Sequence, residues 1–202
     1  MSGIVAQNTL DNTGLIKSPS GGGGAWNFIS KQTASADSTI SFTSGIDSTY
    51  KEYIFYFVNI HPEDYARFQF NLSTDGGSSY NVTKTSTHFE AHNPEGGVAA
   101  PNLLYVAALD LAEGTGVQAL SETVGNDEAE DCLSGHLRLF QPSSTTFVKP
   151  FMSLVNHESA ETTWGAYVAG YGNTTSAIDA IQFSMSSGNI DSGDIFLHGL
   201  TT

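Results

Sequence analysis

Two clusters of histidine and carboxylate side chains are the first candidates for chemistry in this 202-residue chain. His157 and Glu158 precede Glu161, and His61 stands close to the acidic residues 63–64. Two carboxylates on either side of a sugar can act as general acid and base in glycoside hydrolysis. Both clusters lie where turns are expected, and such pairs arise by chance in a chain with 21 acidic residues. The sequence therefore predicts no catalytic residue and no enzyme, with a depolymerase that uses Glu158 or Glu161 as the enzymatic alternative.

Two further groups resemble metal ligands, but neither has the spacing of a known metal site. Residues 126–131 are Asn-Asp-Glu-Ala-Glu-Asp, and they lack the alternating ligands and the turn glycine of an EF-hand loop. His88 and His92 are four residues apart in a strand and loop context, without the helical face of a zinc pair. We predict a solvated acidic loop and no metal, with calcium at 126–131 as the open alternative. No phosphate-binding glycine loop, nucleophile elbow or CxxC pair occurs, so no cofactor is predicted.

Four aromatic residues are candidates for binding. If they are exposed, Tyr80, Phe89, Tyr105 and Trp164 could form a stacking platform for sugars, because aromatic rings suit ligands that are partly apolar. Such residues more often pack in a core or at a contact between subunits, and we favour that interpretation.

Composition narrows the class of protein. The chain has 7 Lys and Arg against 21 Asp and Glu, a formal net charge of -14, and no cluster of basic residues. Nucleic-acid binding requires Lys and Arg to neutralise phosphates, so we expect no nucleic-acid partner. No apolar run approaches the ~20 residues that cross a bilayer, and the first residues do not have the pattern of a secretory signal. We therefore expect no membrane association and folding in a cytoplasm. The single cysteine, Cys132, excludes an internal disulfide.

The alternation of apolar residues predicts a chain built of β-strands. Residues 52–60 are apolar at both odd and even positions, so we expect a strand inside a sheet that is covered on both faces. Residues 66–73 alternate between apolar and polar, as in a strand with one face in water. Residues 117–124 fit a short helix or a strand equally well. Further strands are predicted at 26–31, 39–43, 85–91, 102–109, 132–140, 146–156, 163–171, 178–186 and 194–200.

About ten strands joined by short turns, without a long helix, predict an all-β fold, an antiparallel β-sandwich. The eight-stranded jelly roll suits a chain of this size. The domain spans residues 25–202. Residues 1–24 form a separate N-terminal segment that ends in a flexible connector, Pro-Ser followed by four glycines. This segment is either a disordered leader or an extended arm that becomes ordered on a partner. In the second case Leu10, Leu15, Ile16 and Lys17 would bind that partner.

Several phrases of the sequence are similar to small structural proteins of marine tailed bacteriophages. They are residues 25–30, 40–50, 70–80, 133–140 and 183–190, together with Asn-Thr-Gly-Leu-Ile-Lys at 12–17. The resemblance implies a jelly-roll-like sandwich on the virion, often assembled as a homotrimer and bound to the major capsid protein or another virion protein. Such a protein is assembled in the host cytoplasm. The phrases are structural and do not distinguish the head of the particle from the tail.

Two functions follow as expectations. The first is a capsid decoration or cement protein that docks through its N-terminal arm. The alternative is a tail-fibre or spike module that binds glycans on the host surface. The chain has no shaft repeat and no heptad pattern, which argues against a whole fibre.

Overall fold

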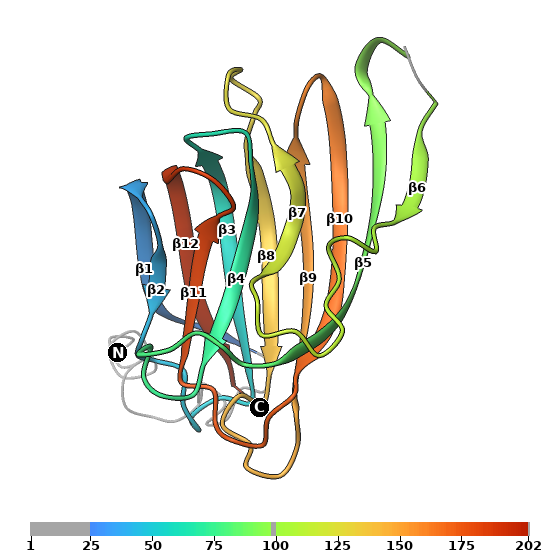
Figure 1. Ribbon diagram of the computed structural model, residues 1–202. Helices are drawn as coiled ribbons and strands as arrows, with labels where there is room; N and C mark the ends of the chain where they lie inside the picture. Colours follow the sequence, from blue (N-terminus) through green and yellow to red (C-terminus); the bar gives the residue numbers. More distant parts are fainter. Residues whose placement is uncertain (1–24, 98–99, 202) are drawn as a thin grey trace, which may run out of the picture.

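The computed structural model describes residues 25–97 and 100–201, and it consists of two packed antiparallel sheets (Figure 1). The larger sheet has eight strands in the order β1-β12-β3-β8-β9-β10-β5-β6, and the smaller has four in the order β2-β11-β4-β7. The prediction of an all-β antiparallel sandwich is confirmed. The N-terminal segment 1–24 lies outside the described residues. Within the described ranges, no helix is long and apolar enough to cross a membrane.

The strand boundaries agree with most of the predicted ones, and residues 66–73 form a strand as expected. The ambiguous residues 117–124 form a strand, and the strand predicted at 102–109 already ends at Tyr105. The elements are β1 (Trp26–Asp37), β2 (Ile40–Phe42), β3 (Glu52–Pro62), β4 (Ala66–Ser73), β5 (Lys84–Pro94), the short 3₁₀ turn η1 (Glu95–Gly97), β6 (Asn102–Tyr105), β7 (Gln118–Val124), β8 (Leu133–Phe140), β9 (Lys149–Glu158), β10 (Thr162–Gly172), β11 (Ala180–Met185) and β12 (Ile190–Leu200).

Eight of these strands have the connectivity of a jelly roll. Four of them, in the order β1-β12-β3-β8, face the four strands β2-β11-β4-β7 of the smaller sheet. The chain passes between the two layers as a double Greek key does. The other four strands are two insertions, β5–β6 and β9–β10, and both extend the larger sheet. The larger sheet is therefore twice as wide as its partner.

The core lies between the sheets and is centred on the ring of Phe183 in β11. The rings of Phe55 and Phe57 from the opposite sheet meet it edge to face, with centroids 5.5 and 5.3 Å away. Phe68 of β4 stacks on it at 5.6 Å. All four side chains are at most 1% exposed. Side chains alternate across a strand, so β3 directs Tyr53, Phe55 and Phe57 inward.

The expectation that residues 52–60 are covered on both faces is wrong. No element of the described chain packs over the outer face of the larger sheet (Figure 1). Ile54 is buried there by its neighbours in the sheet, whereas Val58 is 44% exposed. The apolar residues on the outer side of β3 instead belong to an exposed surface of the protein.

The inner face of β5 is polar although it is buried. The edge strand β7 of the smaller sheet would leave part of its backbone and side chains unpaired, and β5 supplies partners for them. Ser86 Oγ donates to Gln118 Oε1 at 2.5 Å, and Glu90 Oε1 accepts from the N–H of Glu122 at 2.9 Å. Lys84 is fully buried, and its ammonium donates to Asn71 Oδ1 at 2.5 Å. Burial lowers the pKa of Lys84 to about 8.

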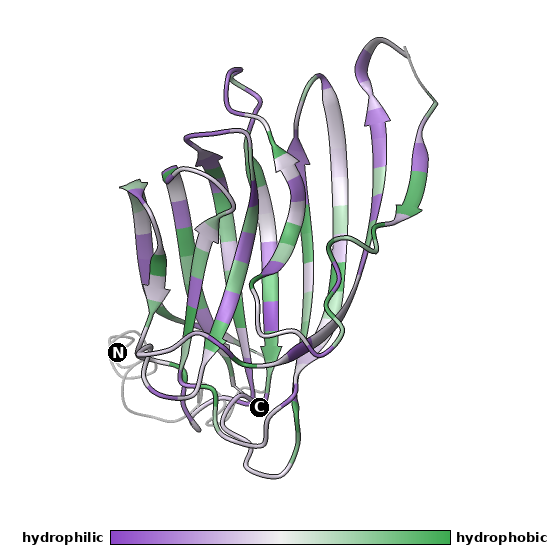
Figure 2. Cartoon of the chain, viewed as in Figure 1, coloured by the Kyte–Doolittle hydropathy of each residue, from purple (hydrophilic) through white to green (hydrophobic). Residues whose placement is uncertain are grey.

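Figure 2 shows hydrophilic residues along much of β5. An exposed sheet edge is a site for unwanted pairing with other chains, and polar side chains that bind it reduce that risk. The polar residues of β5 therefore take the place of a further strand beside β7.

Replacement of Phe183 by alanine tests the position of the core. We expect Phe183→Ala to lower the free energy of unfolding by about 3–5 kcal/mol, because it leaves a cavity among the surrounding rings. Phe147→Ala is the matched control, since that ring is 67% exposed, and we expect a change of about 0.5 kcal/mol or less. Chemical denaturation measures both, and equal effects would contradict the assigned core.

Candidate functional site

An aromatic row crosses the outer face of the larger sheet. The register of the sheet aligns one outward-facing residue from each of its eight strands. In order from β1 to β6, these residues are Lys31, Phe196, Tyr56, His136, Leu154, Tyr167, Phe89 and Tyr105. We call these residues the outer row. Outward residues of this kind interact as cross-strand pairs, so the row is one continuous surface.

The rings of the outer row contact one another while remaining accessible. Phe89 and Tyr167 stack with their planes parallel and their centroids 4.9 Å apart, and each is 40% exposed. Tyr105 is 56% exposed. At the other end, the ammonium of Lys31 lies 5.5 Å from the centre of the Phe196 ring. The row therefore offers exposed rings at the β6 end and a lysine over a ring at the β1 end.

A second row, which mixes apolar and basic residues, lies beside the first. Phe28, His198, Ile54, Arg138 and Met152 are aligned across neighbouring strands. Phe28 is 62% exposed and Met152 54% exposed. Together the two rows form a patch, which we call the outer face. An exposed apolar patch is a candidate surface for binding a partner.

The outer face is close to neutral although the chain is strongly acidic. The two rows contain no carboxylate. Asp194 and Glu52 border them and are each paired with a base, while Asp110 accepts from the Tyr105 hydroxyl at the β6 end. Lys31 Nζ lies 3.0 Å from Asp194 Oδ1, and Arg138 Nε donates to Glu52 Oε1 at 2.5 Å. Burial lowers the pKa of His136, and the nearby Arg138 lowers it further, so this imidazole is neutral at pH 7. The part of the outer face near β1, β12, β3 and β8 therefore carries little net charge, and Asp110 places one carboxylate beside Tyr105 at the β6 end.

The four predicted aromatic candidates do not form one platform. Phe89 and Tyr105 are direct neighbours on the outer row. Trp164 lies on the inner side of β10, where its ring contacts His92 with centroids 4.4 Å apart. Tyr80 lies in the loop after β4, where its carbonyl accepts from Asn71. The predicted arm residues Leu10, Leu15, Ile16 and Lys17 lie outside the described part of the chain.

Sequence analysis did not single out the other members of the outer row, Tyr56, Leu154 and Tyr167 among them. The alternation within each strand could have indicated that they face outward. Tyr56, for example, lies between the inward-facing Phe55 and Phe57. Their alignment into a row depends on the pairing of strands far apart in sequence.

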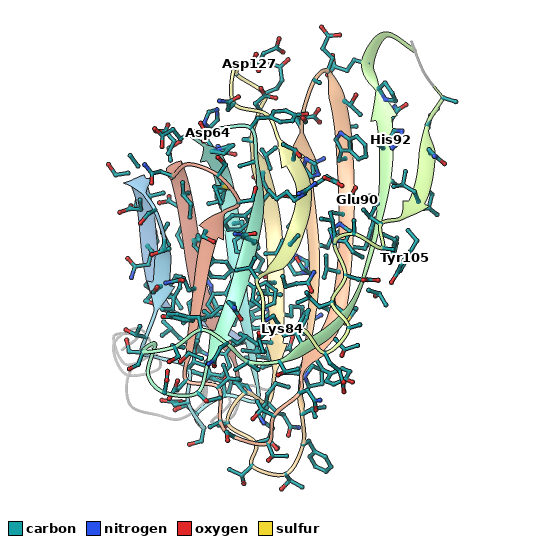
Figure 3. The ribbon with its side chains drawn as sticks, viewed as in Figure 1. Asp64, Lys84, Glu90, His92, Tyr105 and Asp127 are labelled. Atoms are coloured by element: carbon teal, nitrogen blue, oxygen red, sulfur yellow. The ribbon has the colours of Figure 1, made fainter. Side chains whose placement is uncertain are left out.

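A cavity opens beside β7, where the smaller sheet ends. It has a volume of about 270 Å³ and is lined by Tyr65, Glu90, Leu104, Glu122, Thr123, Ser159, Ala160, Thr162 and Trp164. Its residues come from both sheets, and the insertion β9–β10 supplies one wall. Figure 3 shows Glu90 and His92 close together at the end of the sandwich that also carries Asp64 and Asp127, with Lys84 toward the opposite end.

Glu90 is the central charged group of this cavity. Its side chain is fully buried. Oε1 lies 2.9 Å from His88 Nε2 and accepts from the N–H of Glu122, while Oε2 is buried without a hydrogen-bond partner. His157 nearby is also fully buried, and neither of its ring nitrogens has a partner. Burial lowers the pKa of His157 to about 4.

The clusters considered for catalysis have structural roles at the same end. Glu63 accepts from the N–H of Asn189 at 3.1 Å, and Asp64 accepts from the Ser187 hydroxyl at 2.7 Å. His157 faces the interior, while Glu161 lies in the turn after β9 and lines a shallow depression next to the cavity. The structure therefore separates the histidine of this cluster from Glu161.

The acidic loop 126–131 is organised by one of its own carboxylates. Asp131 is 2% exposed, and its Oδ2 accepts from the backbone N–H groups of Asp127 and Glu128 at 3.1 and 3.0 Å. The neighbouring Glu130 raises the pKa of Glu128. Across the described ranges, no three His, Cys, Asp or Glu side chains are grouped so that they could hold a metal ion.

The buried imidazole of His157 predicts a pH dependence of stability. Its folded-state pKa of about 4 lies below the ordinary value of 6.5, so the unfolded chain binds more protons between these values. The contribution of His157 to stability is complete above pH 6.5 and is lost as the pH falls toward 4. We expect wild type to lose stability relative to His157→Leu in this window, by up to about 1.4 kcal/mol per pH unit. Urea denaturation at several pH values measures this, and parallel curves for the two proteins would contradict it.

No protein-family model matches the chain, and no curated protein sequence matches it. The functional argument accordingly depends on the outer face and the cavity.

Proposed function

We propose that this protein is a structural protein of a bacteriophage virion, which decorates the capsid and docks on the major capsid protein through its N-terminal segment. The sequence phrases shared with small phage structural proteins support this proposal. So does the kind of surface that the domain presents. A broad, apolar and neutral face suits a permanent contact with other protein subunits.

The neutrality of the outer face is the observation that carries the proposal. Copies of a chain with a net charge of -14 repel one another wherever unpaired carboxylates meet. Two carboxylates that border the outer face are already paired, Asp194 with Lys31 and Glu52 with Arg138. A second copy meets less repulsion there than on the acidic surfaces, and it can cover exposed rings. We therefore assign the outer face to contact between copies of this chain.

A homotrimer fits the distribution of exposed apolar residues. The edge strand β6 presents Leu103 and Tyr105, which are 67% and 56% exposed. This edge is a different surface from the centre of the outer face, where Met152 and Leu154 lie. A contact between two different surfaces of identical subunits forms a ring when the rotation between them closes and an open filament when it does not, and three is a common number of subunits in such rings. In the proposed trimer, each subunit sets its β6 edge against the outer face of the next.

One observation supports the alternative of a glycan-binding spike module. Phe89, Tyr167 and Tyr105 form a continuous group of exposed rings at one end of the outer row. Sugars stack on such rings through their apolar faces. A glycan array with purified protein distinguishes the alternatives: binding to host polysaccharide that Tyr105→Ala abolishes favours the spike module, and no binding favours the structural role.

Charge on the outer face tests the contact between copies. We expect Leu154→Glu and Leu103→Glu each to convert the trimer into monomers, because each places an unpaired carboxylate in one half of the contact. Phe147→Glu is the control, since Phe147 is equally apolar and 67% exposed but lies in the loop between β8 and β9. Sedimentation velocity measures the assembly state. A monomeric wild type would contradict the trimer.

Binding to capsids tests the proposed function itself. We expect wild-type protein to saturate capsids that were prepared without it, and we expect a variant lacking residues 1–20 not to bind. Leu10→Ser, Leu15→Ser and Ile16→Ser should each weaken binding about tenfold or more, while Lys17→Ala should increase its sensitivity to salt. Quantitative gel analysis of sedimented particles measures occupancy. Full occupancy by the truncated variant would contradict docking through this segment.

A further inference from the structure

The cavity beside β7 contains a carboxylate oxygen that the fold does not use. Glu90 is fully buried, and its Oε1 already has His88 Nε2 and the N–H of Glu122 as partners. Its other oxygen, Oε2, has none. An unpaired polar atom in the interior costs free energy, so a native protein keeps one where it has a reason to do so. This residue lines a cavity, and a ligand there could supply the missing partner.

The walls of the cavity are mainly aromatic and aliphatic. Trp164, Tyr65 and Leu104 contribute apolar surface around Glu90. The Tyr65 hydroxyl accepts from Ser159 at 2.7 Å, which fixes the ring at the rim. A volume of about 270 Å³ suits a single small group rather than an extended chain.

The surroundings of the cavity carry strong negative charge. The paired ends of β3, β8, β9, β10 and β5 bring many carboxylates to this end of the sandwich. They are Glu63, Asp64, Glu90, Glu95, Glu122, Asp127, Glu128, Glu130, Asp131, Glu158 and Glu161. Among the described residues, Arg67 is the one Lys or Arg at this end, and it is paired with Glu122 at 3.1 Å. A field of this sign attracts cations and raises their local concentration.

We propose that this cavity binds a positively charged group at the end of an aliphatic chain, a primary ammonium or a guanidinium. The cation would complete the hydrogen bonding of Glu90 and lie beside the indole of Trp164, which is itself flanked by His92 and His157 with ring centroids 4.4 and 6.0 Å away. The aliphatic stem would contact Leu104 and Tyr65, as the stems of Lys and Arg do on apolar surfaces. The group can belong to a free alkyl amine or to a side chain of a basic partner protein. This inference does not depend on the proposed function.

Trp164 provides a reporter for this binding. The chain has two tryptophans, so Trp26→Phe leaves the Trp164 indole as the one such signal in a proton–nitrogen correlation spectrum. We expect n-butylammonium and n-butylguanidinium to shift this signal in a saturable way. 1-Butanol has the same stem without the charge, and we expect it to bind at least tenfold more weakly. Equal effects of butanol and butylammonium would overturn the proposal.

Two variants establish the role of Glu90. Glu90→Gln keeps the shape of the side chain and an acceptor for the N–H of Glu122, and we expect it to weaken butylammonium binding about tenfold or more. Glu161→Gln is the matched control, because it removes one charge at the same end but outside the cavity, and we expect a change of twofold or less. If Glu90→Gln does not fold, Tyr65→Leu tests the same cavity and should weaken binding severalfold. Unchanged affinity in the folded cavity variant would overturn the proposal.

The two sources of the cation are distinguished with peptides. A short blocked peptide with one lysine should shift the Trp164 signal, and the same peptide with norleucine should not, if the group comes from a partner protein. Binding of butylammonium without binding of the lysine peptide would assign the site to small amines. If methyl glucoside shifts the Trp164 signal and neither butylammonium nor butylguanidinium does, the cavity is a sugar site and the proposal is overturned.

Discussion

The unequal width of the two sheets is the constraint on which the rest of the structure depends. A jelly roll of eight strands covers itself, because each of its sheets has four strands and each buries one face against the other. Here the insertions β5–β6 and β9–β10 both join the same sheet, which becomes eight strands wide while its partner stays at four. The added half of the wide sheet must either leave its inner face open or cover it with something other than a strand.

Polar side chains cover the inner face of the added half of the wide sheet. Beyond β7 the inward residues of β5 are Lys84, Ser86, His88 and Glu90, all buried, and they bind the edge strand of the smaller sheet and the loop that follows β6. Buried polar groups are tolerated only when they are hydrogen-bonded, and most of these are. The exceptions are His88 Nδ1 and Glu90 Oε2, and Glu90 lines the cavity that forms where the two sheets cease to match. The cavity is thus a consequence of the unequal widths.

The outer face follows from the same insertions. Widening the sheet extends the row of outward residues across eight strands, and the two ion pairs Lys31–Asp194 and Arg138–Glu52 keep it neutral. Most of the carboxylates near the cavity lie in turns at one end of the strands, away from the centre of this face. The molecule therefore has an apolar, neutral surface suited to contact with protein and a separate acidic end suited to cations.

The sequence by itself determined the class of fold and most strand positions, because side-chain alternation is local and core strands such as residues 66–73 show it directly. It also identified Phe89 and Tyr105 as candidates for exposed binding residues. The prediction for residues 52–60 was wrong. An apolar residue in a strand can face a core or an exposed surface, and the sequence pattern does not distinguish the two. It could not find Glu90 as a site residue, because Glu90 meets the Glu122 backbone only after strands distant in sequence have paired. Which rings align into one row, and how Glu90 comes to line a cavity, were decided by strand register and sheet width, which are properties of the tertiary structure alone.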